Sequence, residues 1–317
     1  GVQTGGPEAL HQLCDEINRC ATFQVGASIL YVKTSGDGRI LHAAGAQKPV
    51  AYIDLYNAPV ATTDPLVKSC SSTLLVWPEC FTNEMLNYLE NTTNPCQCAI
   101  WWLSVNNNTG RFQEWNRNDI IHLYQSEYAK QYISSNGAMH TYRMTEYISL
   151  TPAPSEKERS IDVLYNPLKG IHYTDAIKKR SGSAMNIRPI GSQDGREQRV
   201  SPERVRELLS SAKIYCDFGP HPGMDRLPRE AALAGCCVVT NKEGAAKYDE
   251  DVPLPSRYKV QEFNADAIHK LLVDLLENFD ERSKDFDEYR TWINGQKERM
   301  KECVSSFLHQ VVEKRMQ

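Results

Sequence analysis

The chain has 317 residues, of which 41% are hydrophobic and 24% are charged, and its formal net charge is −4. This length allows one large or two medium domains with their own cores, and the composition is ordinary for a globular protein. The small negative charge implies no strong overall attraction to nucleic acid, although a local basic groove stays open. No apolar run approaches the roughly 18 residues that a membrane-spanning helix requires.

The ten cysteines show no spacing typical of a zinc site, and Cys236 and Cys237 are neighbours within an expected strand. We interpret them as free buried thiols, which are typical of a reducing compartment. No signal peptide is visible at the start of the sequence. These observations predict a cytoplasmic protein, in the host-cell cytoplasm if the source is viral, with no transmembrane segment. Peripheral contact with a membrane stays open.

The first half of the chain alternates short apolar runs with amphipathic segments, which is typical of α/β proteins. The expected strands are Gln24–Val32, Val50–Leu55, Ser72–Trp77, Ala99–Val105 and Ile120–Tyr124. The expected helices are Pro7–Asn18, Asn83–Glu90 and Ser126–Ser135. They predict an α/β domain over residues 1–150, and the polar, proline-containing stretch 151–160 is the expected linker.

The second half continues the alternation. The expected strands are Ile161–Tyr165, Met185–Pro189, Lys213–Phe218 and Cys236–Thr240, and the expected helices are Tyr173–Arg180, Ser201–Ala212 and Pro228–Ala234. They predict a second α/β domain over residues 161–283, in which Ser201 caps its helix. The amphipathic tail, Asn264–Phe279 and Lys284–Glu313, is expected to cover the second sheet or, alternatively, to bind a partner. Its last part, residues 284–317, is expected to form helices that pack back on the first domain.

The most informative segment is residues 200–241, which predicts a helix, a strand, a polar loop, a second helix and a second strand. Open α/β sheets bind ligands where strands end, and the amide groups at a helix start favour phosphate. The loop therefore predicts an anion site, and its candidate residues are His221, Gly223, Met224, Asp225 and Arg226.

Residues 227–241, LPREAALAGCCVVTN, resemble the donor-binding core of GT-B glycosyltransferases. The likeness is to a divergent branch of the retaining glycosyl transferases group 1, of a viral or bacterial polysaccharide-assembly type. In that family the motif reads P-S-x-x-E-G-F-G-x-P-x-x-E-A-M-A-x-G-x-P-V-V. The resemblance places Glu230 on the glutamate that holds the ribose hydroxyls of the sugar nucleotide. The family's earlier glutamate falls on Pro222, and His221 and Asp225 are the nearest polar candidates for catalysis.

A second candidate is VLYNPLKG, residues 163–170, where a lysine follows an expected strand. A cation at that position can neutralise a diphosphate, although a plain surface lysine is the alternative. The segment resembles the family's strand–G-R-x-x-x-x-K-G motif, which implies that Lys169 binds the pyrophosphate. Asn166 stands near the expected arginine, and Arg226 or Arg229 would have to replace it.

Further candidates come from three other loops. Gly5 and Gly6 precede an expected helix start and resemble the Gly-Gly loop that meets the sugar or phosphate in GT-B enzymes; a plain turn is the alternative. Glu127, at a helix start, is a candidate base on the acceptor side, or a partner of the helix dipole. The resemblance implies that residues 187–200, including Ile190, contact the nucleotide base mainly through the backbone. Other polar residues expected to face the acceptor are Ser104, Asn106 and Ser126.

Together the resemblance implies two Rossmann-like domains facing across a cleft and a hexosyltransferase of glycan biosynthesis. The expected donor is a UDP- or GDP-sugar and the acceptor a glycan hydroxyl, with retention of configuration. No Asp-x-Asp motif follows a strand, so we expect no metal and no cofactor besides the donor. Two alternatives stay open: a sugar-nucleotide epimerase and a catalytically inactive sugar-nucleotide-binding module.

Overall fold

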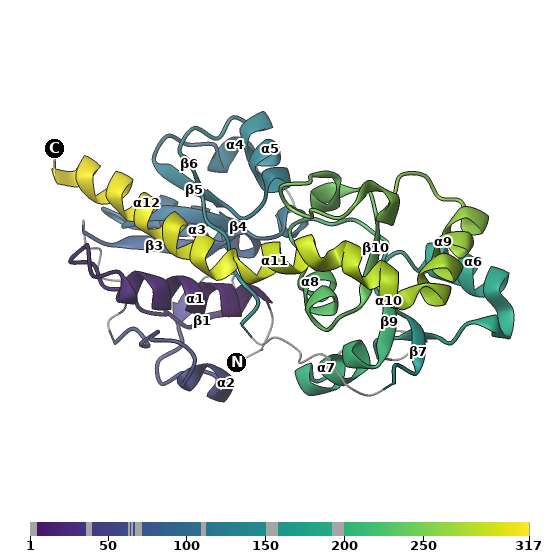
Figure 1. Ribbon diagram of the computed structural model, residues 1–317. Helices are drawn as coiled ribbons and strands as arrows, with labels where there is room; N and C mark the ends of the chain where they lie inside the picture. The colour runs from purple at the N-terminus through teal and green to yellow at the C-terminus, as the bar shows by residue number, and fades with distance from the viewer. Residues whose placement is uncertain are drawn as a thin grey trace. The chain divides into compact units, whose positions relative to one another are not determined.

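The computed structural model describes residues 5–35, 40–62, 64, 66, 72–108, 112–149, 158–191 and 200–316. The chain forms two compact units, one of residues 1–147 with 296–317 and one of residues 148–295. Both units alternate strands and helices, which confirms the α/β class (Figure 1). Within the described part, no helix is long and apolar enough to cross a membrane.

The first unit contains a parallel sheet in the order β3-β4-β5-β6. Its strands are β3 (Leu74–Pro78), β4 (Gln97–Trp102), β5 (Ile120–Tyr124) and β6 (Thr141–Arg143). A separate antiparallel pair joins β1 (Val32–Thr34) and β2 (Ile40–His42). Trp101 and Trp102 are fully buried in two different core clusters, because successive side chains of a strand point to opposite faces. Both faces of the sheet are therefore covered.

Helices from both ends of the chain complete the first unit. They are α1 (Gly5–Arg19), α2 (Val50–Ile53), α3 (Thr82–Asn91), α4 (Phe112–Trp115), α5 (Glu127–Ser135) and α12 (Gln296–Met316). The final helix, α12, lies alongside α1 and also contacts β6 (Figure 1). It buries Met300, Val304, Phe307 and Leu308, whose spacing places them on one helix face.

The second unit contains a parallel sheet in the order β11-β10-β9-β7-β8. Its strands are β7 (Ile161–Tyr165), β8 (Ile187–Pro189), β9 (Ala212–Asp217), β10 (Cys237–Asn241) and β11 (Lys259–Val260). The chain begins inside the sheet, adds β8 on one side of β7 and then adds β9 on the other side. The strand order thus reverses between β7 and β9, which is the position where open α/β sheets bind ligands.

The helices of the second unit are α6 (Ile171–Ser181), α7 (Pro202–Ser210), α8 (Arg226–Leu233), α9 (Ala265–Glu277), α10 (Phe279–Arg282) and α11 (Asp287–Asn294). Short 3-10 turns are η1 (Glu79–Phe81), η2 (Val105–Asn107), η3 (Gly182–Ala184), η4 (Gly244–Lys247), η5 (Ser256–Tyr258) and η6 (Ser283–Phe286). Helix α11 packs on α8, so the division between the units falls later than the expected position at residue 284.

Several sequence predictions need correction. The expected strand Val50–Leu55 is the helical turn α2, because Pro49 fixes its entry and Val50 and Ile53 stay exposed. The expected strand Gln24–Val32 is mostly irregular, with one bridge from Ile29 to Val60. Strands β6 and β11 were not predicted, since both are short and rich in polar residues.

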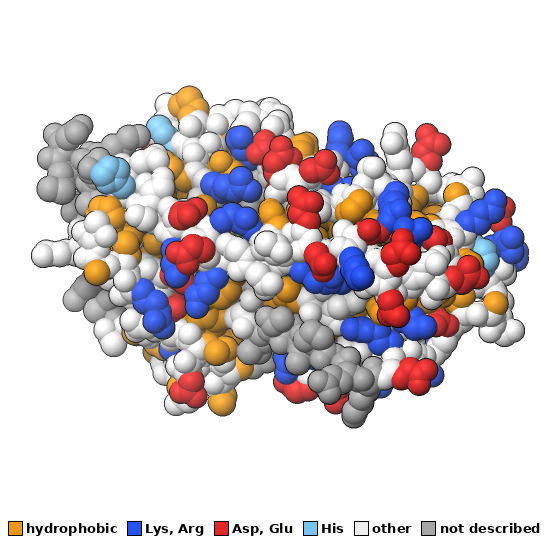
Figure 2. All heavy atoms as spheres, viewed as in Figure 1, with side chains coloured by type: hydrophobic (Ala, Val, Ile, Leu, Met, Phe, Trp, Pro, Cys, Tyr) orange, Lys and Arg blue, Asp and Glu red, His pale blue; other side chains and the backbone are white. Residues whose placement is uncertain are grey.

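Other predictions are confirmed. Strands β5 and β7 have the expected bounds. Ser126 and Ser201 cap α5 and α7, accepting hydrogen bonds from the backbone N–H groups of Ala129 and Arg204. The nine cysteines in the described residues are free as expected, but not all are buried, because Cys80 is exposed and Cys20 and Cys303 are half-buried. On the face shown in Figure 2, Lys and Arg side chains are interspersed with Asp and Glu, in keeping with the small net charge. Most of the expected linker, residues 151–157 of 151–160, lies outside the described part.

Candidate functional site

The loop between β7 and α6 presents Lys169 at the reversal point of the second sheet. Its turn is held by Asn166, whose side-chain oxygen accepts from the Leu168 N–H at 3.0 Å and whose carbonyl accepts from the Lys169 N–H at 3.2 Å. Gly170 then starts α6 with a left-handed backbone (φ 53°). Asn166 thus shapes the turn, near where the motif that this segment resembles would have an arginine.

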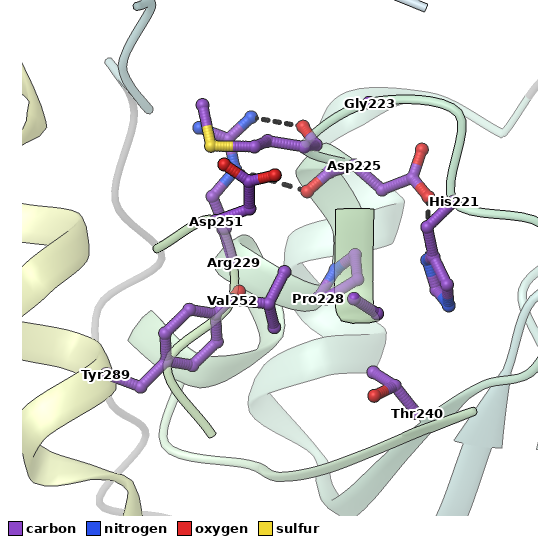
Figure 3. A pocket seen from close by; sticks show the side chains of 11 residues that line it. His221, Gly223, Asp225, Pro228, Arg229, Thr240, Asp251, Val252 and Tyr289 are labelled. Carbon is purple, nitrogen blue, oxygen red and sulfur yellow. Dashed lines mark hydrogen bonds and ion pairs between the residues drawn. The ribbon is translucent and has the colours of Figure 1, made fainter. Parts of the chain in front are cut away.

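The loops after β7 and β9 touch each other. A Cβ atom at Gly170 would lie 1.7 Å from the carbonyl oxygen of Phe218, so only glycine allows this approach. The contact brings the ammonium group of Lys169 to 2.6 Å from Oδ2 of Asp225. Nδ1 of His221 lies 3.0 Å from the same oxygen, and the two side chains point toward each other (Figure 3). The structure therefore brings together three of the predicted site residues.

Asn241, at the end of β10, completes this cluster, and sequence reasoning missed it. Its Oδ1 lies 3.0 Å from the backbone N of Gly219 and 2.9 Å from Nε2 of His221. The imidazole of His221 is buried, with an exposed residue fraction of 3%, and each ring nitrogen has a protein partner. A signal was available, because Asn241 is the polar residue that directly follows the expected strand Cys236–Thr240.

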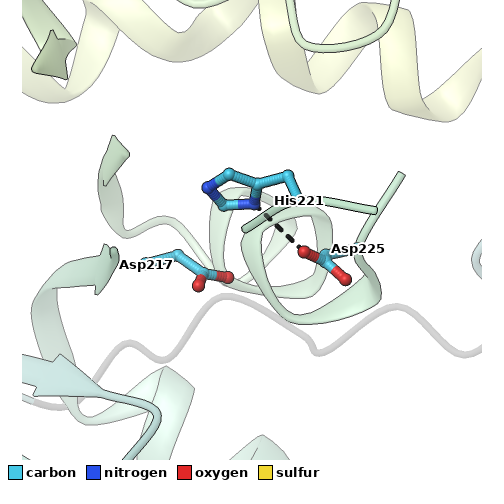
Figure 4. Close-up of side chains that lie close together, drawn as sticks. All are labelled: Asp217, His221 and Asp225. Carbon is cyan, nitrogen blue, oxygen red and sulfur yellow. Dashed lines mark hydrogen bonds and ion pairs between the residues drawn. The ribbon is translucent and has the colours of Figure 1, made fainter. Parts of the chain in front are cut away.

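Asp217, the last residue of β9, is a second residue that sequence reasoning missed. Its Oδ1 has no hydrogen-bond partner in the described structure, and ligand-type atoms of Asp217, His221 and Asp225 lie within 4.8 Å of one another (Figure 4). Divalent metals use such a set. Here, however, Oδ2 of Asp225 already contacts the Lys169 ammonium and the imidazole, and an added cation would be repelled. The arrangement is that of an ion-pair cluster.

The charges of the cluster perturb one another. Burial alone would raise the pKa of Asp225, but the hydrogen bond from His221 and the charge of Lys169 outweigh it and lower that pKa. Burial alone would lower the pKa of His221, yet the hydrogen bond to Asp225 and the nearby carboxylates raise it. Burial raises the pKa of Asp217.

The start of α8 carries Arg226 and Glu230 side by side. Nε of Arg226 lies 3.2 Å from Oε1 of Glu230, and both side chains are about one-fifth exposed (22% and 19%). Arg229 has a different position, since it is buried and donates to the backbone carbonyls of Met224 at 2.7 Å and Asp225 at 3.1 Å. Arg229 therefore holds the loop, and only Arg226 remains as a replacement for the missing arginine.

A small pocket lies behind this loop (Figure 3). It has room for about one water molecule. Its lining residues are His221, Gly223, Met224, Asp225, Pro228, Arg229, Thr240, Ala246, Asp251, Val252 and Tyr289. Lys169, Arg226 and Glu230 are not among them. The pocket lies between the loop and Tyr289 of α11, and it is too small for a nucleotide.

The candidates of the first unit occupy helix starts. Gly5 and Gly6 form the first turn of α1, so the expected glycine loop ahead of the helix is wrong, and a Cβ atom at Gly6 would meet open space. Glu127 begins α5, and its carboxylate binds Nε2 of Gln131 at 2.7 Å and Nζ of Lys130 at 3.3 Å. Its local role is that of an acidic residue in a helix's first turn.

Two further loops of the site were expected from the sequence. Ser104, after β4, donates its backbone N–H to the buried carboxylate of Glu79, which sequence reasoning missed, and Asn106 is exposed. Ile190 follows β8, and its N–H donates to the carbonyl of Tyr165 at 2.8 Å. Residues 192–199 of that loop lie outside the described residues.

No protein-family model and no curated protein matches the sequence significantly. Solved structures do match. The chain is similar to sucrose-phosphate synthase from Thermosynechococcus elongatus, with a TM-score of 0.63 and 12% identity, over 98% of this chain and 94% of that one. It is also similar to Anabaena HepE in complex with UDP-glucose, with a TM-score of 0.57 and 12% identity, over 75% and 78% of the two chains.

A third match is a variant of S. aureus TarM in complex with fondaparinux, α-GlcNAc-glycerol and UDP. The TM-score is 0.56 at 13% identity, and the match covers 79% of this chain and 56% of TarM, so the chain spans little more than half of TarM's length. These likenesses show that the protein has the GT-B fold of glycosyltransferases, in agreement with the resemblance of its sequence motifs.

Proposed function

We propose that the protein is a glycosyltransferase that moves a hexosyl group from a UDP- or GDP-sugar to a glycan hydroxyl. The observation that carries the proposal is the junction of Lys169 with the start of α8 at the reversal point between β7 and β9. A cation and a helix start at the carboxyl ends of parallel strands suit a diphosphate. The GT-B fold supports the same activity, since proteins of that fold include HepE, which was solved with UDP-glucose.

In this proposal, different side chains bind the phosphates and the ribose of the donor. An ammonium group has three N–H donors, so Lys169 can keep its hydrogen bond to Asp225 and still donate to phosphate oxygens. Arg226 adds a guanidinium near the first turn of α8, where the amides of Gly223 and Met224 precede the helix. Glu230 retains carboxylate lone pairs for the ribose hydroxyls beside its bond from Arg226.

Catalysis in this proposal depends on stabilising the departing nucleoside diphosphate. Lys169, Arg226 and the positive end of α8 supply that stabilisation without a metal ion or a further cofactor. Retention of configuration is proposed from the sequence resemblance. Asp225 orients Lys169, and His221 acts through Asp225, because both of its ring nitrogens are already bonded inside the protein.

Glu127 is the proposed base for the acceptor hydroxyl. We expect Glu127→Gln to keep the Gln131 contact and nucleotide affinity while lowering kcat. A loss of nucleotide affinity as large as the loss of kcat would contradict this role.

Calorimetry with UDP, GDP and their sugars tests the donor site. We expect Lys169→Ala and Glu230→Ala each to weaken binding by about tenfold to a hundredfold, because each removes a hydrogen bond to or from a charged group. Lys179→Ala is the matched control, since Lys179 is exposed on α6. The proposal is rejected if no nucleotide binds, or if both site variants bind as the wild type does.

An inactive nucleotide-sugar-binding module is the second candidate, favoured by Pro222, which stands where the resembled motif has a glutamate, and by the missing arginine of the lysine motif. Radiolabelled donor separates the candidates: a transferase moves label to a glycan, an epimerase converts the donor without acceptor, and a binding module does neither. We propose a cytoplasmic enzyme whose partners are the donor and the glycan acceptor, with no nucleic acid, and with peripheral membrane contact compatible with a lipid-borne acceptor.

A further inference from the structure

The orientation of the Asn241 amide determines where the protons of His221 lie. The backbone N–H of Gly219 can only donate, so the Asn241 atom 3.0 Å away from it must be the oxygen. A flipped amide would place two donors against each other. The same oxygen lies 2.9 Å from Nε2 of His221. An acceptor there requires Nε2 to carry a hydrogen.

The other ring nitrogen faces a carboxylate that is held ionised. Nδ1 of His221 lies 3.0 Å from Oδ2 of Asp225, and that oxygen is also 2.6 Å from the ammonium of Lys169. An ammonium at this distance favours the charged carboxylate, which can only accept. Nδ1 must therefore donate as well. With hydrogens on both nitrogens, His221 is an imidazolium.

We propose that Asn241 is a positioning residue that holds His221 as a buried imidazolium, which gives the donor-phosphate site around Lys169 a second positive charge. This inference rests on the proposed function for its phosphate part. It deepens that function, because it assigns the attraction for the diphosphate to a chain of contacts from Asn241 through His221 and Asp225 to Lys169.

The groups that face His221 come from four elements. Lys169 lies in the loop after β7, Asp217 ends β9, and Asp225 precedes α8. Arg229 and Asp251 lie across the small pocket. The two carboxylates nearest the ring outweigh burial and raise the pKa of His221. The imidazolium is therefore complete below the ordinary histidine range and is lost as the pH rises through the raised value.

Nitrogen NMR of the whole 317-residue chain tests the protonation state directly. The signal of His221 is assigned by its loss in His221→Gln, since the chain has eight histidines. At neutral pH we expect both ring nitrogens to show the protonated signature. A neutral ring with one bare nitrogen would overturn the proposal.

Two variants of Asn241 should move the titration of His221 in opposite directions. Asn241→Leu removes the acceptor for Nε2–H, and the midpoint should fall by about one pH unit. Asn241→Asp keeps an acceptor and adds negative charge, so the midpoint should rise. Thr240→Val, the neighbouring β10 residue, is the matched control and should leave the midpoint unchanged. A fall in both Asn241 variants would indicate general loosening and overturn the proposal.

Calorimetry with UDP across the same pH range tests the phosphate part. We expect the dissociation constant to rise about tenfold when His221 loses its proton, because one of two positive charges near the phosphates disappears. In Asn241→Leu this rise should occur at lower pH, whereas the titration of UDP itself is common to both proteins. An identical pH profile would overturn the phosphate role. If UDP and GDP fail to bind at any pH, the proposed function fails, and NMR still decides the protonation state of His221.

Discussion

At the scale of single residues, the candidate site depends on backbone geometry as much as on charged side chains. Lys169 reaches Asp225 only because Gly170 lets the loop after β7 lie against the carbonyl of Phe218. Gly182, at the other end of α6, also has a positive φ (56°), but a Cβ atom there would meet no other atom within 4 Å. A comparison of substitutions at Gly170 and Gly182 therefore separates the cost of backbone strain from the cost of a steric clash.

Gly170→Ala should therefore cost more stability than Gly182→Ala. We expect a loss of about 1–2 kcal/mol for Gly182→Ala, from the positive φ alone, and at least about 3 kcal/mol for Gly170→Ala, from φ and the clash together. Urea unfolding measures both. Equal losses would contradict the close approach of the two loops. Where Gly170→Ala stays folded, UDP binding should also weaken, because Lys169 is displaced.

At the scale of elements, one arginine binds the ends of two helices and the start of a strand. These ends lie where β9 begins, whereas the candidate site lies where β9 ends. Arg159 donates to the carbonyls of Leu209 in α7, of Ala212 at the start of β9 and of Ala234 after α8. The last carbonyls of a helix have no partner within it, so a side chain that binds them stabilises both helices at once.

Removing this arginine should destabilise the second unit. We expect Arg159→Met to lower the free energy of unfolding by about 2–4 kcal/mol, since it leaves several carbonyls without their charged donor. Arg180→Met is the control: Arg180 forms an exposed ion pair with Asp266 and should cost less than about 1 kcal/mol. Thermal unfolding of both variants measures the difference. A loss at Arg159 no larger than at Arg180 would show that the carbonyls find water instead.

Sequence patterns could predict elements of five residues in which apolar residues dominate, such as β5 and β7. They could not predict the shorter β6 or β11, which pairing with neighbouring strands stabilises. Lys169, His221 and Asp225 were predictable because each follows a strand end. Their meeting was not, because it requires β9 to lie beside β7, and strand order is a property of the whole sheet. Asp217 was missed because it lies inside the expected strand Lys213–Phe218. Asn241 directly follows the expected strand Cys236–Thr240, so the same rule could have found it. Arg229 resembled a ligand-binding cation although it is buried.

At the scale of the whole molecule, the chain builds two cores and passes between them twice. It leaves the first unit after residue 147 and returns to it at residue 296, so the last helix in sequence completes the first core. Phe307 of α12 is 4% exposed and packs edge-on against Tyr142, which lies in β6, with ring centroids 5.4 Å apart. In the second core, Leu275 of α9 is fully buried.

Because the cores are separate, a cavity in one should loosen that unit first. We expect Phe307→Ala to lower stability by about 3–5 kcal/mol and to speed hydrogen exchange in α1 and β6, while peptides of β7, β9 and β10 keep their protection. Leu275→Ala is the reciprocal control and should speed exchange in α9 and β9 only. Mass spectrometry of exchanged peptides reads both units in one experiment. Faster exchange throughout the chain in either variant would show that the two cores unfold together, and the return of α12 would then couple the units.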